Sequence, residues 1–350
     1  MAADKPLTLR RQKGRSTTRA RQSSESFQVD VLVDTGVFHL EQPFSYFLPE
    51  ELEAVIDAGS LIKVPFKNDL RNGVVLSIKE KSQASLKPVH SLLTQVRLSQ
   101  SFLEFTKKVS ERYIANQASI LSACLPSFTK VMNTSLDAST LHRSKSSKPA
   151  RKLFLLNRLE AVESRVVRHI KERKGLNLLV ILPTQREIEG VIKALGVIDQ
   201  QIIEIGSHLT SSQRRRNFEL AATATSIIVI GTRSAIMAPM AYIDEILIAE
   251  ESVEHFQEQK APYWNVRDMA LLRSESEHCS ITFVSHSISL ELARLVEIGW
   301  ITATSERKFL GGHRANIATE PNSYHDTIRK ALKNGPVLVS VADKGYANTF

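Results

Sequence analysis

The chain has 350 residues, of which 42% are apolar and 24% are charged, a composition that supports two globular domains with sizeable cores. Its two cysteines, Cys124 and Cys279, lie far apart, and its ten histidines show no ligand spacing, so we expect no disulfide framework and no metal site. No run of about 18 apolar residues occurs in the sequence, so we expect a cytoplasmic protein without membrane contact.

Positive charge is concentrated in two segments. Residues 1–22 contain seven basic residues and one acid, a net +6, and residues 129–152 contain six and one, a net +5. Because the whole chain carries +9, the remaining residues sum to −2. Residues 1–26 lack apolar periodicity and are expected to form a disordered basic tail, and residues 129–152 a basic linker. Such segments attract nucleic-acid phosphates without regard to sequence, or only keep a protein soluble.

Residues 27–128 are expected to form a small β-rich domain closed by a helix. From Phe27 to Val33, valines alternate with polar residues such as Asp30, which is typical of a half-buried strand. Leu61–Phe66 and Val74–Ile78 predict two further strands, and Asn72-Gly73 predicts a turn before the second of them. A helix follows, marked by apolar residues at helical spacing: Phe102, Phe105, Val109 and Tyr113.

Residues 153–320 alternate short apolar strands with amphipathic helices. This pattern predicts βαβ units and a parallel sheet that is covered on both faces, so the fold class is α/β. Ligands of such folds bind at the carboxyl ends of the strands. The expected strands are 153–156, 178–182, 202–205, 227–230, 243–248 and 281–284, and the expected helices lie around 159–170, 188–195, 213–222, 266–273 and 289–297.

Motifs at these strand ends, and two segments near the start of the chain, resemble one family. The segments are Pro43-Phe44-Ser45-Tyr46, Val64-Pro65-Phe66, Gly231-Thr232-Arg233-Ser234-Ala235, Ala249-Glu250-Glu251, the run from Gln259 to Asp268, and Ser285-His286-Ser287-Ile288-Ser289-Leu290-Glu291. In order and spacing they are similar to the PriA family of bacterial replication-restart proteins (primosomal protein N′), which are superfamily 2 helicases. The resemblance runs from about residue 27 to residue 350.

The resemblance implies a domain organisation and a set of helicase motifs. Residues 27–128 would be the family's N-terminal domain, which binds the 3′ end of DNA at a fork. Residues 153–320 would be a RecA-like (P-loop NTPase-like) first helicase lobe. Its motif residues would be Gly231, Thr232 and Arg233, matching GTRSA, and Ser285 and Ser287, matching SATPSLE.

The family's phosphate-binding loop is missing from this sequence. Such a loop needs glycines for close backbone approach, a lysine for the β- and γ-phosphates and a Ser or Thr for magnesium. The family's GVTGSGKT should follow the strand at 153–156, but residues 157–164 contain no glycine and no lysine. Read without the family, this segment is the start of an amphipathic helix. Four of its residues stand where triphosphate would bind: Asn157, Glu160, Glu163 and Ser164.

The family's DEEH box is also altered. Ala249 takes the place of the aspartate that holds magnesium, Glu250 and Glu251 remain, and Ser252 takes the place of the histidine. Losing the lysine, the glycines and the aspartate together leaves no phosphoryl-transfer site. We therefore expect no catalytic residues, no ATP or magnesium cofactor, and no enzyme activity.

The expected DNA contacts lie in the N-terminal domain. Phe44 and Tyr46 match family aromatics and would stack on a terminal base, unless they are core aromatics of a small β domain. Ser45 replaces a family aspartate. Lys67 replaces the glycine after the family's VPF, and Lys87 matches a family lysine, so both are expected to contact phosphate.

Residues 321–350 resemble the beginning of the family's second lobe. Gly335–Val341 matches its first strand, and Lys344-Gly345-Tyr346 matches the RGY before the family's zinc-binding cysteines. No cysteine cluster follows here, so we expect a truncated second lobe without zinc, and about 30 poorly packed final residues, because a lone strand cannot bury both faces.

Three functions agree with these observations. The first is a DNA-binding replication-restart and primosome-assembly protein without helicase activity, with forked or single-stranded DNA as ligand and other primosome or single-strand-binding proteins as candidate partners. The second is an active ATP-dependent 3′-5′ helicase with an atypical nucleotide site. The third is a relic with no remaining DNA role, against which the basic tail and linker argue. Residues 157–164 and Ala249 favour the first.

Overall fold

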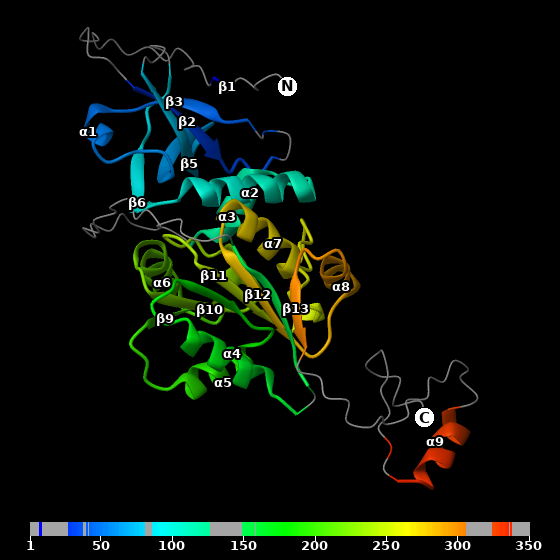
Figure 1. The fold of residues 1–350 in the computed structure, drawn as a ribbon. Helices are drawn as coiled ribbons and strands as arrows, with labels where there is room; N and C mark the ends of the chain where they lie inside the picture. The colour runs from blue at the N-terminus through cyan, green and yellow to red at the C-terminus, as the bar shows by residue number, and fades with distance from the viewer. Residues whose placement is uncertain are drawn as a thin grey trace, which may run out of the picture. The chain divides into compact units, whose positions relative to one another are not determined.

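The chain forms two compact units, Met1–Arg307 and Lys308–Phe350. The computed structural model describes residues 7–8, 27–37, 40, 42–80, 86–126, 149–157, 159–305, 324–335 and 337. The first unit contains a six-stranded sheet and a seven-stranded sheet with its helices (Figure 1). Among the described residues of the second unit is the helix α9 (Tyr324–Leu332), while the strand expected at Gly335–Val341 lies largely outside the described residues.

The N-terminal sheet has the strand order β1-β3-β2-β5-β4-β6. Its pairs are antiparallel except for β1 and β3, which run parallel. The helix predicted from Phe102 to Tyr113 is confirmed as α2. The elements are β1 (Leu7–Thr8), β2 (Phe27–Val33), β3 (Phe44–Phe47), α1 (Glu50–Glu53), β4 (Ser60–Phe66), β5 (Asp69–Glu80), β6 (Ser91–Arg97), α2 (Gln100–Tyr113) and α3 (Gln117–Cys124).

One expectation about this domain was wrong, and another lies largely outside the described residues. Of the expected basic tail 1–26, the structure describes only Leu7–Thr8, which pair with β3. Asn72-Gly73 is not a turn, because β5 runs through it without a break. The turn lies at Lys67, which adopts a φ of 53°, and Gly73 is needed because a Cβ there would lie 2.5 Å from Cγ1 of Val31.

The second sheet is entirely parallel, as predicted, with the order β13-β7-β12-β11-β8-β10-β9. Its first strand begins at Arg151, inside the expected linker, whose residues 129–148 lie outside the described residues. The elements are β7 (Arg151–Leu155), α4 (Val162–Glu172), β8 (Leu178–Ile181), α5 (Gln185–Leu195), β9 (Gln201–Ile205), α6 (Ser211–Thr223), β10 (Ile227–Gly231), η1 (Arg233–Met237), β11 (Glu245–Ala249), η2 (Glu254–Phe256), α7 (Val266–Ser276), β12 (Ser280–Ser285), α8 (Leu290–Glu297) and β13 (Thr302–Ser305).

Alternate residues of each central strand enter different cores. In β11, Leu247 and Ala249 pack with α4 and α5, while Ile246 and Ile248 pack on the opposite face with α6 and α7. The core on the face of α6 and α7 extends beyond the parallel lobe, because it continues into α2, α3 and the N-terminal sheet. The two sheets are therefore separate, but the domains that carry them share one hydrophobic core instead of packing independently.

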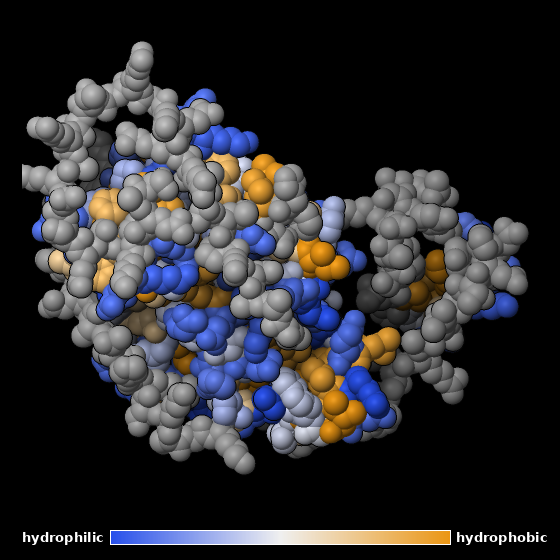
Figure 2. Space-filling view, turned by 90° about the horizontal axis from the view of Figure 1, so that it is seen from above, coloured by the Kyte–Doolittle hydropathy of each residue, from blue (hydrophilic) through white to orange (hydrophobic). Residues whose placement is uncertain are grey.

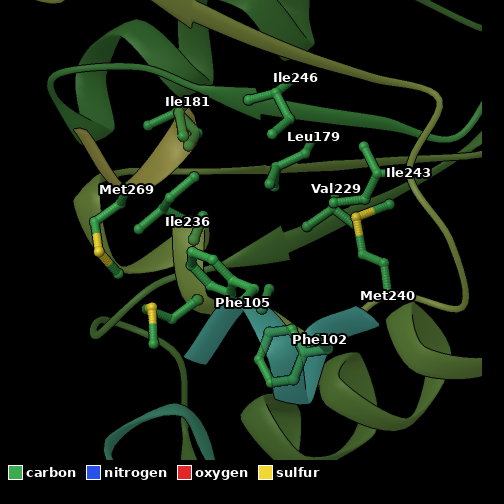
Figure 3. Packing of buried hydrophobic residues seen from close by; sticks show 14 of the residues in the cluster. Phe102, Phe105, Leu179, Ile181, Val229, Ile236, Met240, Ile243, Ile246 and Met269 are labelled. Atoms are coloured by element: carbon green, nitrogen blue, oxygen red, sulfur yellow. The ribbon is translucent and has the colours of Figure 1, made fainter. Parts of the chain in front are cut away.

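The interface between the two domains is built around Arg273 of α7, which is completely buried. Its guanidinium donates to the carbonyls of Ile236 and Ala238 and pairs with Glu277 at 2.8 Å. The same guanidinium lies 5.3 Å and 5.5 Å from the ring centroids of Phe102 and Phe105 in α2. Figure 3 shows Phe105 of α2 pointing toward Ile236 and the buried residues of the parallel sheet, with Phe102 on the same helix.

Polar contacts surround this interface. Lys108 pairs with Glu275 at 3.4 Å, and Arg112 pairs with Asp268 at 3.6 Å. The hydroxyl of Tyr113 accepts a hydrogen bond from the backbone N–H of Asn265, the residue that caps α7. The C-terminal half of α2 is thus attached along the length of α7, from its cap Asn265 to Glu275 in its last turn.

A buried ionic cluster fixes the start of β11. Glu245 accepts hydrogen bonds from Arg173 and Thr282, and its Oε1 lies 2.8 Å from Nε2 of His169. Burial alone would raise the pKa of Glu245, but the hydrogen bond and charge of His169, with the hydrogen bonds from Thr282 and Arg173, lower the pKa to about 2. The cluster joins α4 to the strand whose other end carries Ala249.

In the part of the chain that the structure describes, no helix combines the length and apolarity required to cross a membrane. On the face shown in Figure 2, hydrophobic residues stand in small groups among hydrophilic ones.

Phe102→Ala should lower the free energy of unfolding by about 3–5 kcal/mol, because the ring is buried and packs against both domains. Urea denaturation should still show a single transition, with its midpoint at a lower urea concentration than in wild type. Leu290→Ala is the control, since Leu290 is 87% exposed and its loss should change little. A wild-type protein that unfolds in two well-separated steps would contradict the shared core.

Candidate functional site

The strand order brings the degenerate motifs together at one edge of the parallel sheet. The strands β7, β12 and β11 are neighbours, and their carboxyl ends lie in register, with Ser285 opposite Leu155 and Val284 opposite Ala249. The segments that follow them, beginning at Leu156, His286 and Glu250, therefore meet at the edge where ligands of such sheets bind.

Glu250 is the centre of this edge. It has a φ of 50°, an uncommon left-handed conformation for a residue with a side chain, and its N–H donates to the carbonyl of Val284. Its carboxylate accepts from the hydroxyl of Ser285 at 3.0 Å and from the backbone N–H of His286 at 3.1 Å. The imidazole Nδ1 of His286 lies 2.8 Å from the same carboxylate. Both oxygens of the Glu250 carboxylate thus have partners at the end of β12 and in the residue that follows it.

The segment that replaces the phosphate-binding loop is held by its own side chains. The Asn157 carboxamide accepts from the backbone N–H groups of Leu159 and Glu160, and so forms a tight turn. Nε2 of His286 lies 2.9 Å from the carbonyl oxygen of Glu160. His286 therefore connects this turn to Glu250, across the edge of the sheet.

Acidic residues stand at the start of α4, at the place where a phosphate-binding loop would have its lysine. Ala161 provides no side-chain cap, and Glu163 lies in the first turn with Ser164 beside it. Glu160 pairs with Arg168 at 3.5 Å. A helix N-terminus attracts anions, but here the chain supplies its own carboxylates.

The remaining acids do not converge on this position. Ala249, the last residue of β11, is fully buried in the core beside α4 and offers no side-chain ligand to the edge. Glu251 points elsewhere: its carboxylate accepts from Ser289 N–H at 2.7 Å and pairs with Arg267 at 3.5 Å. Arg267 also binds Glu291 at 3.2 Å. Glu251 therefore anchors the start of α8.

The GTRSA segment has a structural role in the described residues. A Cβ at Gly231 would lie 2.3 Å from the carbonyl oxygen of Ile205, so only glycine fits between β10 and β9. Thr232 precedes the short helix η1. Arg233 donates to the carbonyl of Gln257 at 2.7 Å and pairs with Glu258 at 3.3 Å, and so holds the loop before α7. At the end of β12, the Ser285 hydroxyl lies within hydrogen-bond distance of both the Glu250 carboxylate and the carbonyl of Ser287, so these two acceptors share its single proton.

The expected stacking residues of the N-terminal domain are core residues instead. Phe44 is 3% exposed and packs edge-on against Phe66, with ring centroids 5.3 Å apart. Tyr46 is fully buried, its hydroxyl donates to the carbonyl of Pro65, and burial raises its pKa. Neither ring can stack on a base, because β3 lies between β1 and β2 and directs both rings into the core.

Ser45, at the position of the family aspartate, belongs to a buried polar cluster. Its hydroxyl donates to Asp30 at 2.8 Å and accepts from Gln28 at 3.0 Å. Asp30 lies directly across from Ser45 in β2 and also accepts from Ser77 and Lys79. Burial would raise the pKa of Asp30, but the hydrogen bond and charge of Lys79, with the hydrogen bonds from Ser45 and Gln28, lower it.

Asp30 was expected on the solvated face of a half-buried strand, and this was wrong. The side chain is 5% exposed because β2 is a central strand between β3 and β5, so its polar face is covered by neighbouring side chains. A carboxylate is thus present beside position 45, one strand away from the place where the family has it.

The two lysines that were expected to contact phosphate lie on the surface. Lys67 is exposed at the β4–β5 turn, where its Nζ lies 5.9 Å from the centroid of Phe66. Lys87 is half-buried, and its carbonyl accepts from the N–H of Phe47 at the end of β3. Among the described residues, no group of three or more His, Cys, Asp or Glu side chains could hold a metal ion.

Three residues of these sites were missed by sequence reasoning. His286 had one signal, a large polar side chain at a position where the similar motif has alanine. Arg267 could have been found from its position beside Asp268, at the end of the motif that runs from Gln259 to Asp268. Asp30 had none, since an acid in an alternating strand normally faces solvent.

Comparisons with known proteins agree with this arrangement. Residues 30–126 match the model of the PriA 3′DNA-binding domain (3′BD). The chain is 23% identical to a probable replication restart protein PriA of Mycobacterium tuberculosis, over 89% of this chain and 55% of the relative. It is 24% identical to replication restart protein PriA of Rickettsia conorii, over 73% of this chain and 43% of the relative. The chain thus spans about half the length of the curated relatives it matches.

Solved structures with a similar arrangement include the DEAD-box helicase Mss116 bound to ssRNA and UDP-BeF. That match has a TM-score of 0.35 and 12% identity, and covers 54% of this chain and 39% of the other. A DEAD box protein from Methanococcus jannaschii gives a TM-score of 0.33 at 12% identity, covering 53% of each chain.

A small antiparallel domain that matches a DNA-binding domain model, followed by a parallel α/β lobe, defines the class of protein to which this chain is similar. Within that class, the chain is similar to replication restart protein PriA over most of its length, and residues 30–126 match the model of the PriA 3′DNA-binding domain.

Ser45→Asp should destabilise the protein strongly, because it would place a second carboxylate against Asp30, whose oxygen lies 2.8 Å from the serine hydroxyl. We expect a loss of several kcal/mol at neutral pH, partly recovered as the pH falls and one carboxyl takes up a proton. Thermal unfolding between neutral and acidic pH measures the effect. Ser45→Ala, which removes one hydrogen bond, should cost only about 1–3 kcal/mol. Equal stability of the aspartate variant and wild type would contradict the cluster.

Proposed function

We propose that this chain is a DNA-binding protein of replication restart that recognises forked or 3′-ended DNA and does not hydrolyse ATP. The match of residues 30–126 to a 3′DNA-binding domain carries the DNA-binding half of the proposal. The occupation of Glu250 by Ser285 and His286, where nucleotide chemistry would need a free edge, supports the second half.

DNA affinity is proposed to have two sources. Lys67 and Lys87 would give the structure-dependent contacts from the N-terminal domain. The basic residues of 1–22, with a net charge of +6, would add attraction to any DNA, because each neutralised phosphate releases a counterion. Phe44 and Tyr46 have no part in this proposal, since both rings are buried. Primosome and single-strand-binding proteins remain candidate partners on the resemblance alone.

The absence of ATP chemistry can be tested on the purified protein. We expect no DNA-stimulated ATP hydrolysis and no saturable MgATP binding at millimolar concentration, because residues 157–164 offer neither a glycine turn nor a lysine. Isothermal titration calorimetry and phosphate release give the two readouts. A DNA-dependent hydrolysis rate that follows the protein through purification and is lost in Glu250→Gln would instead establish an active helicase with an atypical site.

DNA recognition can be tested by fluorescence anisotropy on a fork with a free 3′ end, the same fork with a blocked 3′ end, and plain duplex. Lys67→Ala with Lys87→Ala should reduce fork binding about tenfold and duplex binding less, whereas Lys171→Ala, an exposed lysine of α4, should change neither. Replacing Arg15, Arg19 and Arg21 with Gln should weaken all three DNAs equally and flatten the salt dependence. No fork preference at any salt concentration would refute recognition by this domain.

A further inference from the structure

One face of the N-terminal sheet changes character along β2. Leu32, Leu61 and Val74 share a hydrophobic core with α2 and α3. Gln28 and Asp30 point to the same side of β2 as Leu32, because side chains alternate along a strand. The face is therefore apolar beneath α2 and α3 and polar toward the start of β2.

An aromatic ring lies on this polar part of the face. Phe47, the last residue of β3, pairs directly with Gln28 and so points to the same side, whereas Phe44 and Tyr46 point into the core. Phe47 is half-buried and belongs to none of the three hydrophobic clusters of the described residues. Its backbone is fixed, because its N–H donates to the carbonyl of Lys87. The ring is thus held in place and available to a ligand.

The hydrogen bonds beside the ring fix the orientation of the Gln28 carboxamide. The carboxylate of Asp30, paired with Lys79, can only accept hydrogen bonds. The Ser45 hydroxyl donates its single proton to Asp30 at 2.8 Å, so its oxygen is left to accept from Nε2 of Gln28 at 3.0 Å. Nε2 therefore faces this cluster, and Oε1 faces away from it. No hydrogen bond between described residues uses Oε1, so Gln28 presents a free acceptor next to Phe47.

We propose that Phe47 and Gln28 form a binding site for an unpaired base of single-stranded DNA. The base stacks on the Phe47 ring, and Oε1 of Gln28 accepts from an N–H group at the edge of the base. The inference rests on the proposed function and names the side chains of the N-terminal domain that contact a base.

The surroundings of the ring favour a nucleotide over a protein partner. Lys79 lies directly opposite Gln28 in β5, and its half-exposed ammonium has three donors, of which Asp30 takes one. The other donors are available to the phosphate of the bound nucleotide. A single ring among polar and cationic groups suits a base with its phosphate, whereas the centre of a protein interface is depleted of charge.

Fluorescence anisotropy of the full chain with a labelled oligothymidine of about 16 nucleotides, and with a blunt duplex of the same length, tests the site. Phe47→Leu retains apolar bulk but removes the aromatic face, so single-strand affinity should fall about tenfold while duplex affinity stays unchanged. Gln28→Met removes the acceptor and should weaken single-strand binding about fivefold. Phe47→Trp should bind the single strand like wild type, and its added tryptophan emission should be quenched as the strand saturates the protein.

Phe27→Leu is the matched control, because Phe27 is also half-buried and precedes Gln28 in β2 but packs against the core on the opposite face. This variant should bind both DNAs like wild type. The site is overturned if Phe47→Leu binds the single strand like wild type, if it loses duplex binding equally, or if Phe47→Trp is not quenched. Those outcomes leave the proposed function intact, since the Lys67 and Lys87 variants test it separately, whereas a wild-type protein that binds no DNA overturns both. Circular dichroism confirms the fold of each variant, and Phe47→Trp decides the question if Phe47→Leu does not fold.

Discussion

The packing of Arg273 between the two domains is the interaction on which the rest of this structure depends. A buried guanidinium is costly unless it is hydrogen-bonded, and here each of its three nitrogens donates to one acceptor: two carbonyls of the η1 region and the carboxylate of Glu277. The hydrophobic faces of Phe102 and Phe105 close the remaining side. Since these rings belong to α2, the N-terminal domain cannot leave the lobe without exposing both the arginine and the shared core. The contacts of α2 with Asn265 and Asp268 then place Arg267, and through it Glu251 and α8.

The strand-end edge shows how a ligand site can be filled by the protein itself. In folds of this class, anions bind where helix N-termini and strand ends meet. Here the chain brings carboxylates to that place, at Glu160 and Glu250, and engages them with its own side chains, Arg168, Ser285 and His286. The acids at this edge therefore have partners within the chain itself.

Sequence periodicity predicted the parallel lobe well because buried strands such as Ile227–Gly231 are short apolar runs between amphipathic helices. Prediction from the sequence failed where strand pairing overrides the turn preference of a short segment. Asn72-Gly73 has the composition of a turn, yet two neighbouring strands hold it extended in β5. The motif residues could be located by resemblance, but their roles could not: Phe44 matches a family aromatic and nevertheless lies in the core.

The sequence by itself determined the fold class, the positions of the basic tail and the loss of the glycines and lysine that a phosphate-binding loop requires, because these depend on composition and local spacing. Only the tertiary structure decided which side chains meet. Asp30 became the partner of Ser45 through the pairing of β2 with β3, and His286 reached Glu160 because β12 lies between β7 and β11. The first of these contacts joins residues that are 15 positions apart in the sequence, and the second joins residues that are 126 positions apart. Strand order and register set both contacts, and no local pattern in the chain encodes them.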